Sequence, residues 1–284
     1  VTFSDVLEYY EDDPDTKMIV LYVERIKEGR RFLEVASRVT RKKPIFVLKG
    51  GKSEQGKRKV ISHTGALASS QEIYSAVFKQ CGVIQIDSIT DIEDMITAFS
   101  TLPFMKGNGV GVMTYTMGAG ILSIDVCSRY GLKVPELSQV TLKEIEALFP
   151  SWAPPGNPVD LAMPHFVMGH DGGLALETIL SAILCDPVID GVILISAATP
   201  DCEFYDHSEI VSKLSRVHSD KPIVLWLYSP DPHREMAKKY EGKGGVVVFP
   251  SLERALRTLA AMSDYYRFLT GANNPSFSLD GRDV

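Results

Sequence analysis

His63 has the clearest potential for nucleophilic chemistry in this sequence of 284 residues. It lies in the segment Ser62–Ala68, whose small and polar residues are typical of an exposed loop tip. One imidazole nitrogen becomes a nucleophile when a carboxylate accepts a hydrogen bond from the other. Glu24 can supply this carboxylate, because it directly follows an apolar run with the pattern of a buried strand. Glu24 and His63 are therefore the candidate catalytic pair.

Two less specific interpretations of this pair stay open. A lone histidine is more often structural than reactive, and Glu24 could form a salt bridge with Arg25 or Lys49. A serine hydrolase is excluded, because the sequence has no G-x-S-x-G elbow. No metal site is predicted, since His165 and His170 do not share a helical face and lack further ligands.

A glycine-rich turn supplies a second candidate site. Gly118, Ala119 and Gly120 come after a predicted strand and open a predicted helix. Backbone N–H groups at the positive end of a helix are suited to a phosphate. The same glycines could instead allow the helix to pack closely on the sheet, and both interpretations stay open here.

The connection after Leu48 is unusually long. It runs for about twenty residues, whereas most strand-to-helix connections have two to six, so we expect a functional loop that carries His63. The segment Gly51–Arg58 resembles a phosphate-binding P-loop, but Arg58 stands where that motif needs Ser or Thr.

Positive charge gathers around this connection. Eight basic residues and one acid, Glu54, lie between Arg41 and Lys59, an excess of seven charges in a chain of net charge −6. The excess predicts an anionic partner, although a solvated basic loop gives the same pattern. The eight are Arg41, Lys42, Lys43, Lys49, Lys52, Lys57, Arg58 and Lys59.

Composition narrows the classes of protein. With 45% hydrophobic and 23% charged residues, the chain is globular rather than disordered. It has no apolar run of about 20 residues, so no membrane span is predicted. The negative net charge argues against a nucleic-acid-binding protein. Its four cysteines are far apart in sequence, which is typical of reduced thiols in a cytoplasmic protein.

Apolar runs alternate with amphipathic stretches along the whole chain, which predicts an α/β fold with doubly wound parallel sheets. The predicted strands are Met18–Val23, Pro44–Leu48, Val83–Asp87, Gly109–Tyr115, Gly191–Ala197, Pro222–Tyr228 and Gly245–Phe249. The predicted helices include Phe3–Glu11, Arg30–Val39, Glu72–Gln80, Asp91–Phe99, Gly118–Tyr130, Leu174–Leu184 and Leu252–Leu269.

A segment rich in Pro, Gly and Asn, Leu102–Gly109, is typical of a linker. We therefore expect two flavodoxin-like domains, 1–105 and 106–284. The first domain offers three strands and is expected to be incomplete at its N-terminal side.

Several segments resemble the alpha side of the NDP-forming acyl-CoA synthetases. These enzymes belong to the succinyl-CoA synthetase superfamily and include ADP-forming acetyl-CoA synthetase. The most specific matches are Lys43–Lys52, Ser62–Ala68 and Ala76–Ile84, and further matches are Phe3–Lys17, Ile19–Glu24 and Gly29–Ala36. Gly118–Gly120 and Gly156–Leu161 match the second ligase domain of the family.

The resemblance implies a reaction that interconverts acyl-CoA, ADP and phosphate with a free acid, ATP and CoA, through acyl phosphate and phosphohistidine. His63 would be the phosphorylated residue and Glu24 its stabilising carboxylate. The phosphoryl group would meet Thr64, Gly65 and the turn Gly118–Gly120. No tightly bound cofactor is implied. ATP or ADP, phosphate and CoA would be substrates, with Mg²⁺ held at an ATP-grasp partner.

The resemblance also implies partners. Family members carry a Rossmann-like CoA-binding domain and an ATP-grasp domain or subunit, and neither occurs in this sequence. We therefore expect this chain to be a fragment of a larger enzyme. That enzyme is expected to be oligomeric and to act on a small-molecule acid. Ser69 replaces a glycine expected in the histidine motif. Two alternatives remain: a ligand-sensing region of a protein acetyltransferase, in which no phosphoryl transfer occurs, and a plain flavodoxin-like binding module.

Overall fold

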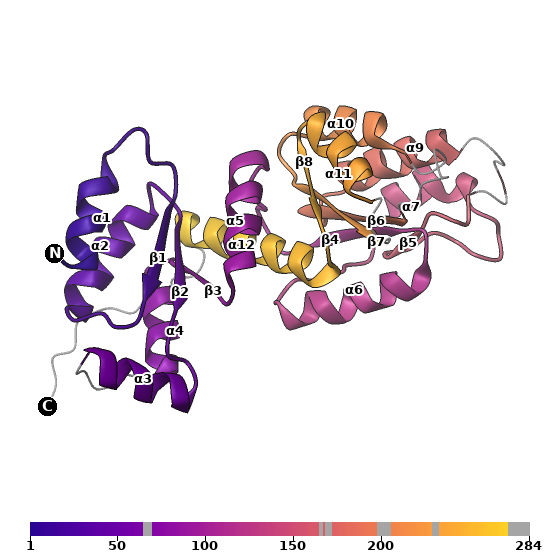
Figure 1. Cartoon of the computed structure of the whole chain (residues 1–284). Coiled ribbons are helices and arrows are strands. Elements are labelled where there is room, and N and C mark those ends of the chain that lie inside the picture. Colours follow the sequence, from indigo (N-terminus) through magenta and orange to yellow (C-terminus); the bar gives the residue numbers. More distant parts are fainter. Residues whose placement is uncertain (65–69, 165–166, 168–171, 198–205, 229–232, 272–284) are drawn as a thin grey trace, which may run out of the picture. The chain divides into compact units, whose positions relative to one another are not determined.

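The computed structural model describes residues 1–64, 70–164, 167, 172–197, 206–228 and 233–271. The chain divides into two compact units. Unit 1 comprises Val1–Ile96 with Arg267–Val284, and unit 2 comprises Thr97–Tyr266. Each unit is built on its own parallel sheet, which confirms the predicted α/β fold class (Figure 1). The domain boundary near residue 105 stays a prediction.

All seven predicted strands are present, each within two residues of its expected ends. Unit 1 contains α1 (Phe3–Glu11), β1 (Ile19–Val23), α2 (Gly29–Thr40), β2 (Ile45–Lys49), α3 (Glu54–Thr64), α4 (Gln71–Gln80), β3 (Ile84–Ile86) and the start of α5 (Ile89–Thr101). Unit 2 contains β4 (Val110–Thr114), α6 (Met117–Arg129), α7 (Gln139–Ile145), a 3₁₀ turn (Glu146–Leu148), β5 (Val159–Asp160), α9 (Gly172–Cys185), β6 (Gly191–Ala197), α10 (Ser208–Val217), β7 (Ile223–Tyr228), α11 (His233–Gly242), β8 (Val246–Phe249) and most of α12 (Leu252–Thr270).

The sheet of unit 1 has the order β1-β2-β3. One of its faces packs apolar side chains of β1 and β2 against α2 and α4, and α1 in turn packs on α2. Local sequence signals set the helix starts. Thr2 and Asp5 form a capping box at α1, and Ser70 caps α4 by accepting a hydrogen bond from the Ile73 N–H.

The prediction of a long loop after β2 is wrong. Helix α3 occupies Glu54–Thr64, and residues 65–69 lie outside the described part of the chain. Its start is stabilised by the Ser53 hydroxyl, which accepts a hydrogen bond from the Gly56 N–H at 3.1 Å. The helix escaped prediction because most of its described side chains are exposed and charged, so it shows no clear apolar face. It begins before Gly56, which also excludes the P-loop geometry.

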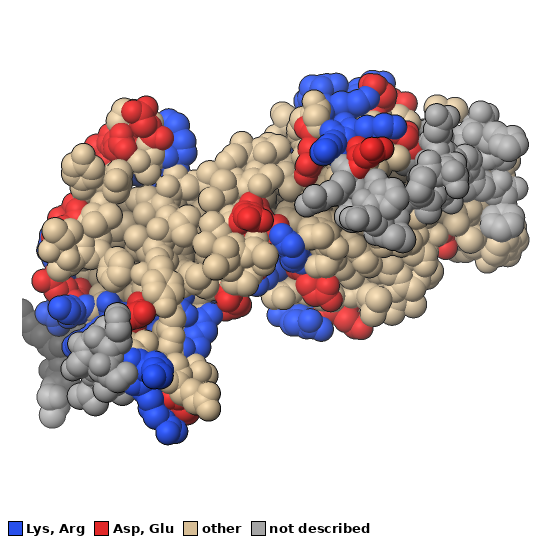
Figure 2. Space-filling view, viewed as in Figure 1, with Lys and Arg blue, Asp and Glu red and all other residues tan. Residues whose placement is uncertain are grey.

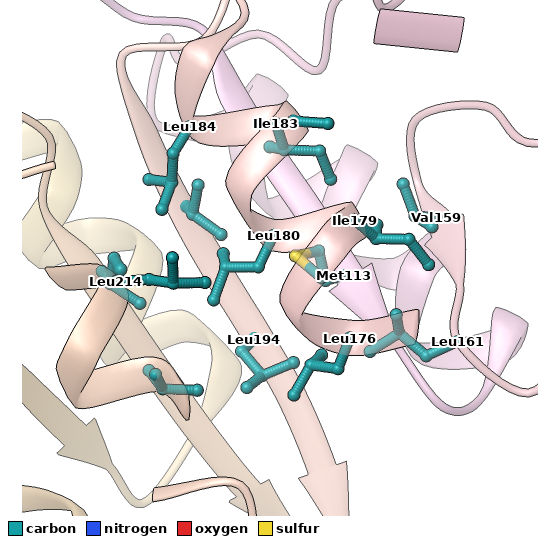
Figure 3. Close-up of a cluster of buried hydrophobic side chains, with 14 of the residues drawn as sticks. Met113, Val159, Leu161, Leu176, Ile179, Leu180, Ile183, Leu184, Leu194 and Leu214 are labelled. Carbon is teal, nitrogen blue, oxygen red and sulfur yellow. The ribbon is translucent and has the colours of Figure 1, made fainter. Parts of the chain in front are cut away.

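The sheet of unit 2 has the order β5-β4-β6-β7-β8. Numbered within the unit, this is 2-1-3-4-5, the flavodoxin-like order, with its switch point between β4 and β6. One face packs against α7, α9, α10 and α11, and Figure 3 shows the α9 part of this core. The other face packs against α6 and α12. Strands buried on both faces explain the continuous apolar runs in the sequence.

Strand β5 was not predicted, because only two residues pair with β4. The side chain of Asn157 adds hydrogen bonds to β4 beyond those two paired residues. The Asn157 carboxamide accepts a hydrogen bond from the Val112 N–H at 2.9 Å and donates to the carbonyls of Val110 and Pro135. Asn157 therefore takes the place of a strand backbone along the edge of β4.

Cys81 and Cys127 are buried free thiols, and burial raises the pKa of each to about 12. Cys185 is a free thiol too, but it is exposed. Cys202 lies outside the described residues. Within the described residues, no helix has the length and hydropathy needed to cross a membrane.

Candidate active site

The carboxyl edge of the sheet in unit 1 gathers polar residues. Strand β1 is followed by Glu24, β2 ends in Lys49, and β3 is followed by Asp87. Val23 and Lys49 are register partners on adjacent parallel strands. Ligands bind beyond this edge in sheets of this kind.

Glu24 is held by a neighbour on its own strand. The Tyr22 hydroxyl donates to Glu24 Oε1 at 3.2 Å. Partial burial, followed by the Glu24 carboxylate, raises the pKa of Tyr22 above its ordinary value, so Tyr22 stays a donor at neutral pH. Among the described residues no Lys, Arg or His side chain lies within 4.0 Å of this carboxylate, so the salt bridge with Arg25 or Lys49 does not form. The half-buried carboxylate is thus available to another group.

His63 lies in the last turn of α3. The structure describes its backbone and that of Thr64, while their side chains and all of Gly65 lie outside the described residues. Helix α3 follows β2 after the short segment Gly50–Ser53 and lies beyond the carboxyl ends of β1 and β2 (Figure 1). The structure therefore brings the helix that carries His63 to the sheet edge that carries Glu24.

The eight basic residues between Arg41 and Lys59 do not form one surface. Lys42 pairs with Glu11 and Asp12, and Lys43 donates to two backbone carbonyls. Lys52 pairs with Asp87 at the sheet edge. Arg58 and Lys59 are exposed on α3, where Figure 2 shows basic side chains gathered at the lower left. The excess charge that the sequence predicted is thus partly neutralised. Arg41 lies over the ring of Phe268.

The sequence marked Lys49 as a possible salt-bridge partner of Glu24 and as one of the eight basic residues between Arg41 and Lys59. Its side chain is 7% exposed, and its ammonium lies 4.7 Å from the centroid of the Tyr74 ring. The ammonium also donates to the Gly50 carbonyl. The hydroxyl of Tyr74 accepts a hydrogen bond from the Ile26 N–H at 3.0 Å, so Tyr74 connects the ends of both strands.

In unit 2, the turn Gly118–Gly120 lies in the first turn of α6, directly after β4 at the switch point. The N–H groups of Ala119 and Gly120 donate to the Thr116 carbonyl at 3.0 and 3.3 Å. Among the described residues no acceptor is found for the N–H groups of Met117 and Gly118. The open donors of this helix end are therefore Met117 and Gly118, and phosphate binding here stays a prediction.

The two glycines of this turn differ in what surrounds them. A Cβ on Gly120 would lie 3.0 Å from Pro158 Cβ and 3.2 Å from Thr114 Cγ2, so close packing explains this glycine. A Cβ on Gly118 would meet only Thr116 Oγ1, at 3.8 Å, and the residue is exposed. Packing therefore accounts for Gly120 but not for Gly118.

A histidine that the sequence did not single out lies beside this turn. The Tyr115 hydroxyl and His207 Nε2 are hydrogen-bonded at 2.6 Å, and the two rings stack. The backbone N–H of His207 donates to the Tyr240 hydroxyl at 3.2 Å. These contacts tie the end of β4 to the start of α10. No local pattern marks His207, because its partners are distant in sequence.

Comparisons with known proteins cover both units. The model of the succinyl-CoA ligase like flavodoxin domain matches residues 1–99. The alpha subunit of acetate–CoA ligase (ADP-forming) II from Pyrococcus furiosus is 38% identical over 98% of this chain and 59% of its own length. The alpha subunit of acetate–CoA ligase (ADP-forming) I from the same organism is 33% identical over 91% of this chain and 54% of its own length. The chain thus spans a little over half the length of these relatives.

A solved structure agrees with these relatives. The dinucleotide-forming acetyl-coenzyme A synthetase 1 of Ca. Korarchaeum cryptofilum, in complex with phosphate and ADP, superposes with a TM-score of 0.81 at 27% identity. The match covers 96% of this chain and 59% of that chain. A 4-hydroxybutyrate–CoA ligase (ADP-forming) from Nitrosopumilus maritimus is 31% identical over 91% of this chain and 36% of its own length.

Proposed function

Because the chain belongs to the family of the ADP-forming CoA ligases, we propose that it is the part of such an enzyme that carries a phosphoryl group on His63. The complete enzyme interconverts acyl-CoA, ADP and phosphate with a carboxylic acid, CoA and ATP. Nothing in these relatives favours the acetyltransferase alternative.

The proposed reaction has three balanced steps. Phosphate attacks the acyl-CoA thioester, which gives acyl phosphate and releases CoA. An imidazole nitrogen of His63 then attacks the phosphorus, the bond between phosphorus and the acyl oxygen breaks, and the free acid leaves. Finally the phosphoryl group passes from His63 to ADP, which yields ATP and restores the imidazole.

Glu24 is the proposed positioning carboxylate for His63. It would accept a hydrogen bond from one imidazole nitrogen and favour the cationic ring that forms when the other nitrogen attacks. The observation that supports this role best is a half-buried carboxylate at the strand end beside α3, held by Tyr22 and paired with no cation among the described residues. In a structural ion pair the carboxylate would already be neutralised.

The open N–H groups of Met117 and Gly118 are the proposed binding site for the phosphoryl group within unit 2. Donors at a helix N-terminus bind phosphate without a change of protonation. Separately, within unit 1, Thr64 and Gly65 are the proposed contacts of a phosphoryl group on His63. The CoA-binding and ATP-grasp parts, with Mg²⁺ on the nucleotide, would come from the rest of the enzyme, which we place in the cytoplasm.

Labelling tests the proposal. The enzyme, assembled with its CoA-binding and ATP-grasp parts, is incubated with acyl-CoA and radiolabelled phosphate, and the protein-bound label is tested for stability. Phosphohistidine is labile in acid and stable in base. We expect such a label in the wild type and none in His63→Ala, and full labelling of His63→Ala would refute the assignment.

A further inference from the structure

We propose that Arg25, Lys27 and Arg30 form a docking surface for an acidic protein face, that of the part of the enzyme that holds ADP. This inference rests on the proposed function. The three residues, called the cationic patch below, follow β1 and end in the first turn of α2. They therefore lie at the edge of the sheet that also carries Glu24.

The cationic patch differs sharply from the arginine that follows it. All three side chains of the patch are exposed, and among the described residues no Asp or Glu carboxylate lies within 4.0 Å of any of them. Arg31, by contrast, pairs with Asp5 at 2.7 Å, Glu8 at 2.8 Å and Glu28 at 3.3 Å. The acids of this region neutralise Arg31 and leave the patch with its full positive charge.

The backbone that carries the patch is tied to the core of unit 1. Ile26 lies between Arg25 and Lys27, and its side chain packs against the buried cluster of unit 1. Its N–H donates to the Tyr74 hydroxyl at 3.0 Å. The two flanking cations are thus presented from an anchored segment, so a partner that binds them has little backbone to order.

The start of α2 also places positive charge where it is unfavourable for the helix. The first turn of α2 holds Arg30 and no acid, and Glu28 at the N-cap makes no capping hydrogen bond. Helices α1 and α4 have side-chain caps and carry Asp5 and Glu72 in their first turns. A cation at the positive end of a helix opposes the helix dipole. Helix stability therefore does not explain Arg30, whereas binding of an acidic partner does.

An exposed patch of this kind fits a protein surface better than a small molecule. Sites for small molecules are concave and bury most of the ligand, whereas these three side chains extend into solvent. Exposed charges at the rim of an interface speed the encounter of two proteins and fix their orientation. The partner that complements the patch is a surface rich in Asp and Glu.

The proposed reaction identifies which part of the enzyme carries that surface. The patch lies at the edge of Glu24, beyond which α3 carries His63. Acyl phosphate is a small molecule that can move to His63 by itself. ADP, in contrast, is held by another part of the enzyme, which must come to this edge to receive the phosphoryl group. We therefore assign the patch to the docking of the part that holds ADP.

The test mixes the subunit that contains this chain with the separately purified subunit that holds ADP, and follows their association by stopped-flow fluorescence. Replacing all three cations by Gln should lower the association rate constant at low salt about tenfold or more. The difference should vanish near 1 M salt, where charges are screened beyond about 3 Å. Because the three side chains are exposed, the melting temperature should stay nearly constant. Equal rates and salt dependence for variant and wild type would overturn the proposal.

Arg30→Gln and Arg31→Gln form a matched pair of adjacent residues. Arg30→Gln should slow association without a change in melting temperature. Arg31→Gln should lower the melting temperature, because it breaks three ion pairs, and should leave association unchanged. Arg30→Lys keeps the charge and should restore most of the rate. Equal slowing by Arg30→Gln and Arg31→Gln would show a general effect of net charge and refute the assignment to the patch.

Two further measurements separate the alternatives. ADP alone should not raise the melting temperature of the subunit that contains this chain; stabilisation by ADP of the wild type but not of the triple variant would make the patch a nucleotide site and overturn the docking proposal. The proposed function fails separately, if the wild type is never labelled on His63. Association does not require phosphorylation, so His63→Ala should associate at the wild-type rate, and the salt comparison still decides the role of the patch.

Discussion

At the carboxyl edge of its sheet, unit 1 presents charged side chains, whereas unit 2 presents backbone N–H groups. In unit 1 the groups are the Glu24 carboxylate and the Lys49 ammonium, together with the helix that carries His63. In unit 2 they are the open N–H groups of Met117 and Gly118. Both edges belong to parallel sheets, so the strand arrangement alone does not set the chemistry.

The difference separates two tasks of a phosphoryl-transfer enzyme. A residue that accepts a phosphoryl group changes its charge and needs a carboxylate that compensates the change. A place that only binds phosphate needs fixed donors, which a helix N-terminus supplies. We therefore expect changes in unit 1 to alter reaction rates and changes in unit 2 to alter stability or phosphate affinity.

Asn157→Ala should give the largest effect on stability, a loss of roughly 2–4 kcal/mol in unit 2. The substitution removes three hydrogen bonds and leaves the Val112 N–H and two carbonyls without these partners. Chemical denaturation followed by tryptophan fluorescence measures this loss of stability. The signal reports on unit 2, because both tryptophans, Trp152 and Trp226, belong to that unit.

Asn108→Ala is the control for Asn157, since the Asn108 side chain donates a single exposed bond to the Gly131 carbonyl. It should cost less than about 1 kcal/mol. Equal losses for the two variants would show that the Asn157 bonds do not hold the edge of β4.

Glu24→Gln should slow phosphorylation of His63 about 10- to 150-fold, which corresponds to a charge-assisted hydrogen bond of about 1.5–3 kcal/mol. Because no cation pairs with Glu24 in the described structure, the melting temperature should stay nearly constant. Rapid-quench labelling and calorimetry measure the two quantities. Glu28→Gln removes a carboxylate that pairs with Arg31 and should leave the rate unchanged. A fall in stability with an unchanged rate for Glu24→Gln would end its role in positioning.

Gly118→Ala and Gly120→Ala form a matched pair on one turn. Gly120→Ala should destabilise unit 2 by roughly 1–3 kcal/mol, because the new Cβ would press on Pro158 and Thr114. Gly118→Ala has space for its Cβ and should fold normally, with stability equal or up to about 1 kcal/mol higher. Its methyl group should narrow access to the open N–H groups and weaken phosphate affinity several-fold. Unaltered affinity in Gly118→Ala would argue against the phosphate site in unit 2.

Tyr22→Phe should give the smallest effect, a fall of less than about tenfold in the rate of His63 phosphorylation. The variant removes one hydrogen bond at 3.2 Å to Glu24 and keeps the charge of the carboxylate. Tyr9→Phe, on an exposed tyrosine of α1, is the control. A loss in Tyr22→Phe as large as that in Glu24→Gln would mean that the hydroxyl itself takes part in the reaction.

The sequence predicted much of this arrangement. Continuous apolar runs predicted the buried strands, and the residue after such a run placed Glu24 at a ligand-binding edge. The glycine turn was correctly placed after β4. These features depend on local pattern, which a single sequence displays directly.

Features that depend on distant contacts could not be predicted. Helix α3 has no clear apolar face, so only the Ser53 cap marks its start. The roles of Asn157 and Tyr115 depend on partners more than 20 residues away. Gly118 and Gly120 are indistinguishable in the sequence, because what separates them is the position of Pro158.

The most direct test of the central claim is whether phosphorylation of His63 is fast enough to lie on the reaction path. The complete enzyme is mixed with acyl-CoA and labelled phosphate, quenched at millisecond intervals, and digested to locate the label; ADP is then added to phosphorylated enzyme. We predict label on the peptide that contains His63, formed and discharged at least as fast as steady-state turnover. Label that forms more slowly than turnover, or that lies on another residue, would contradict the account.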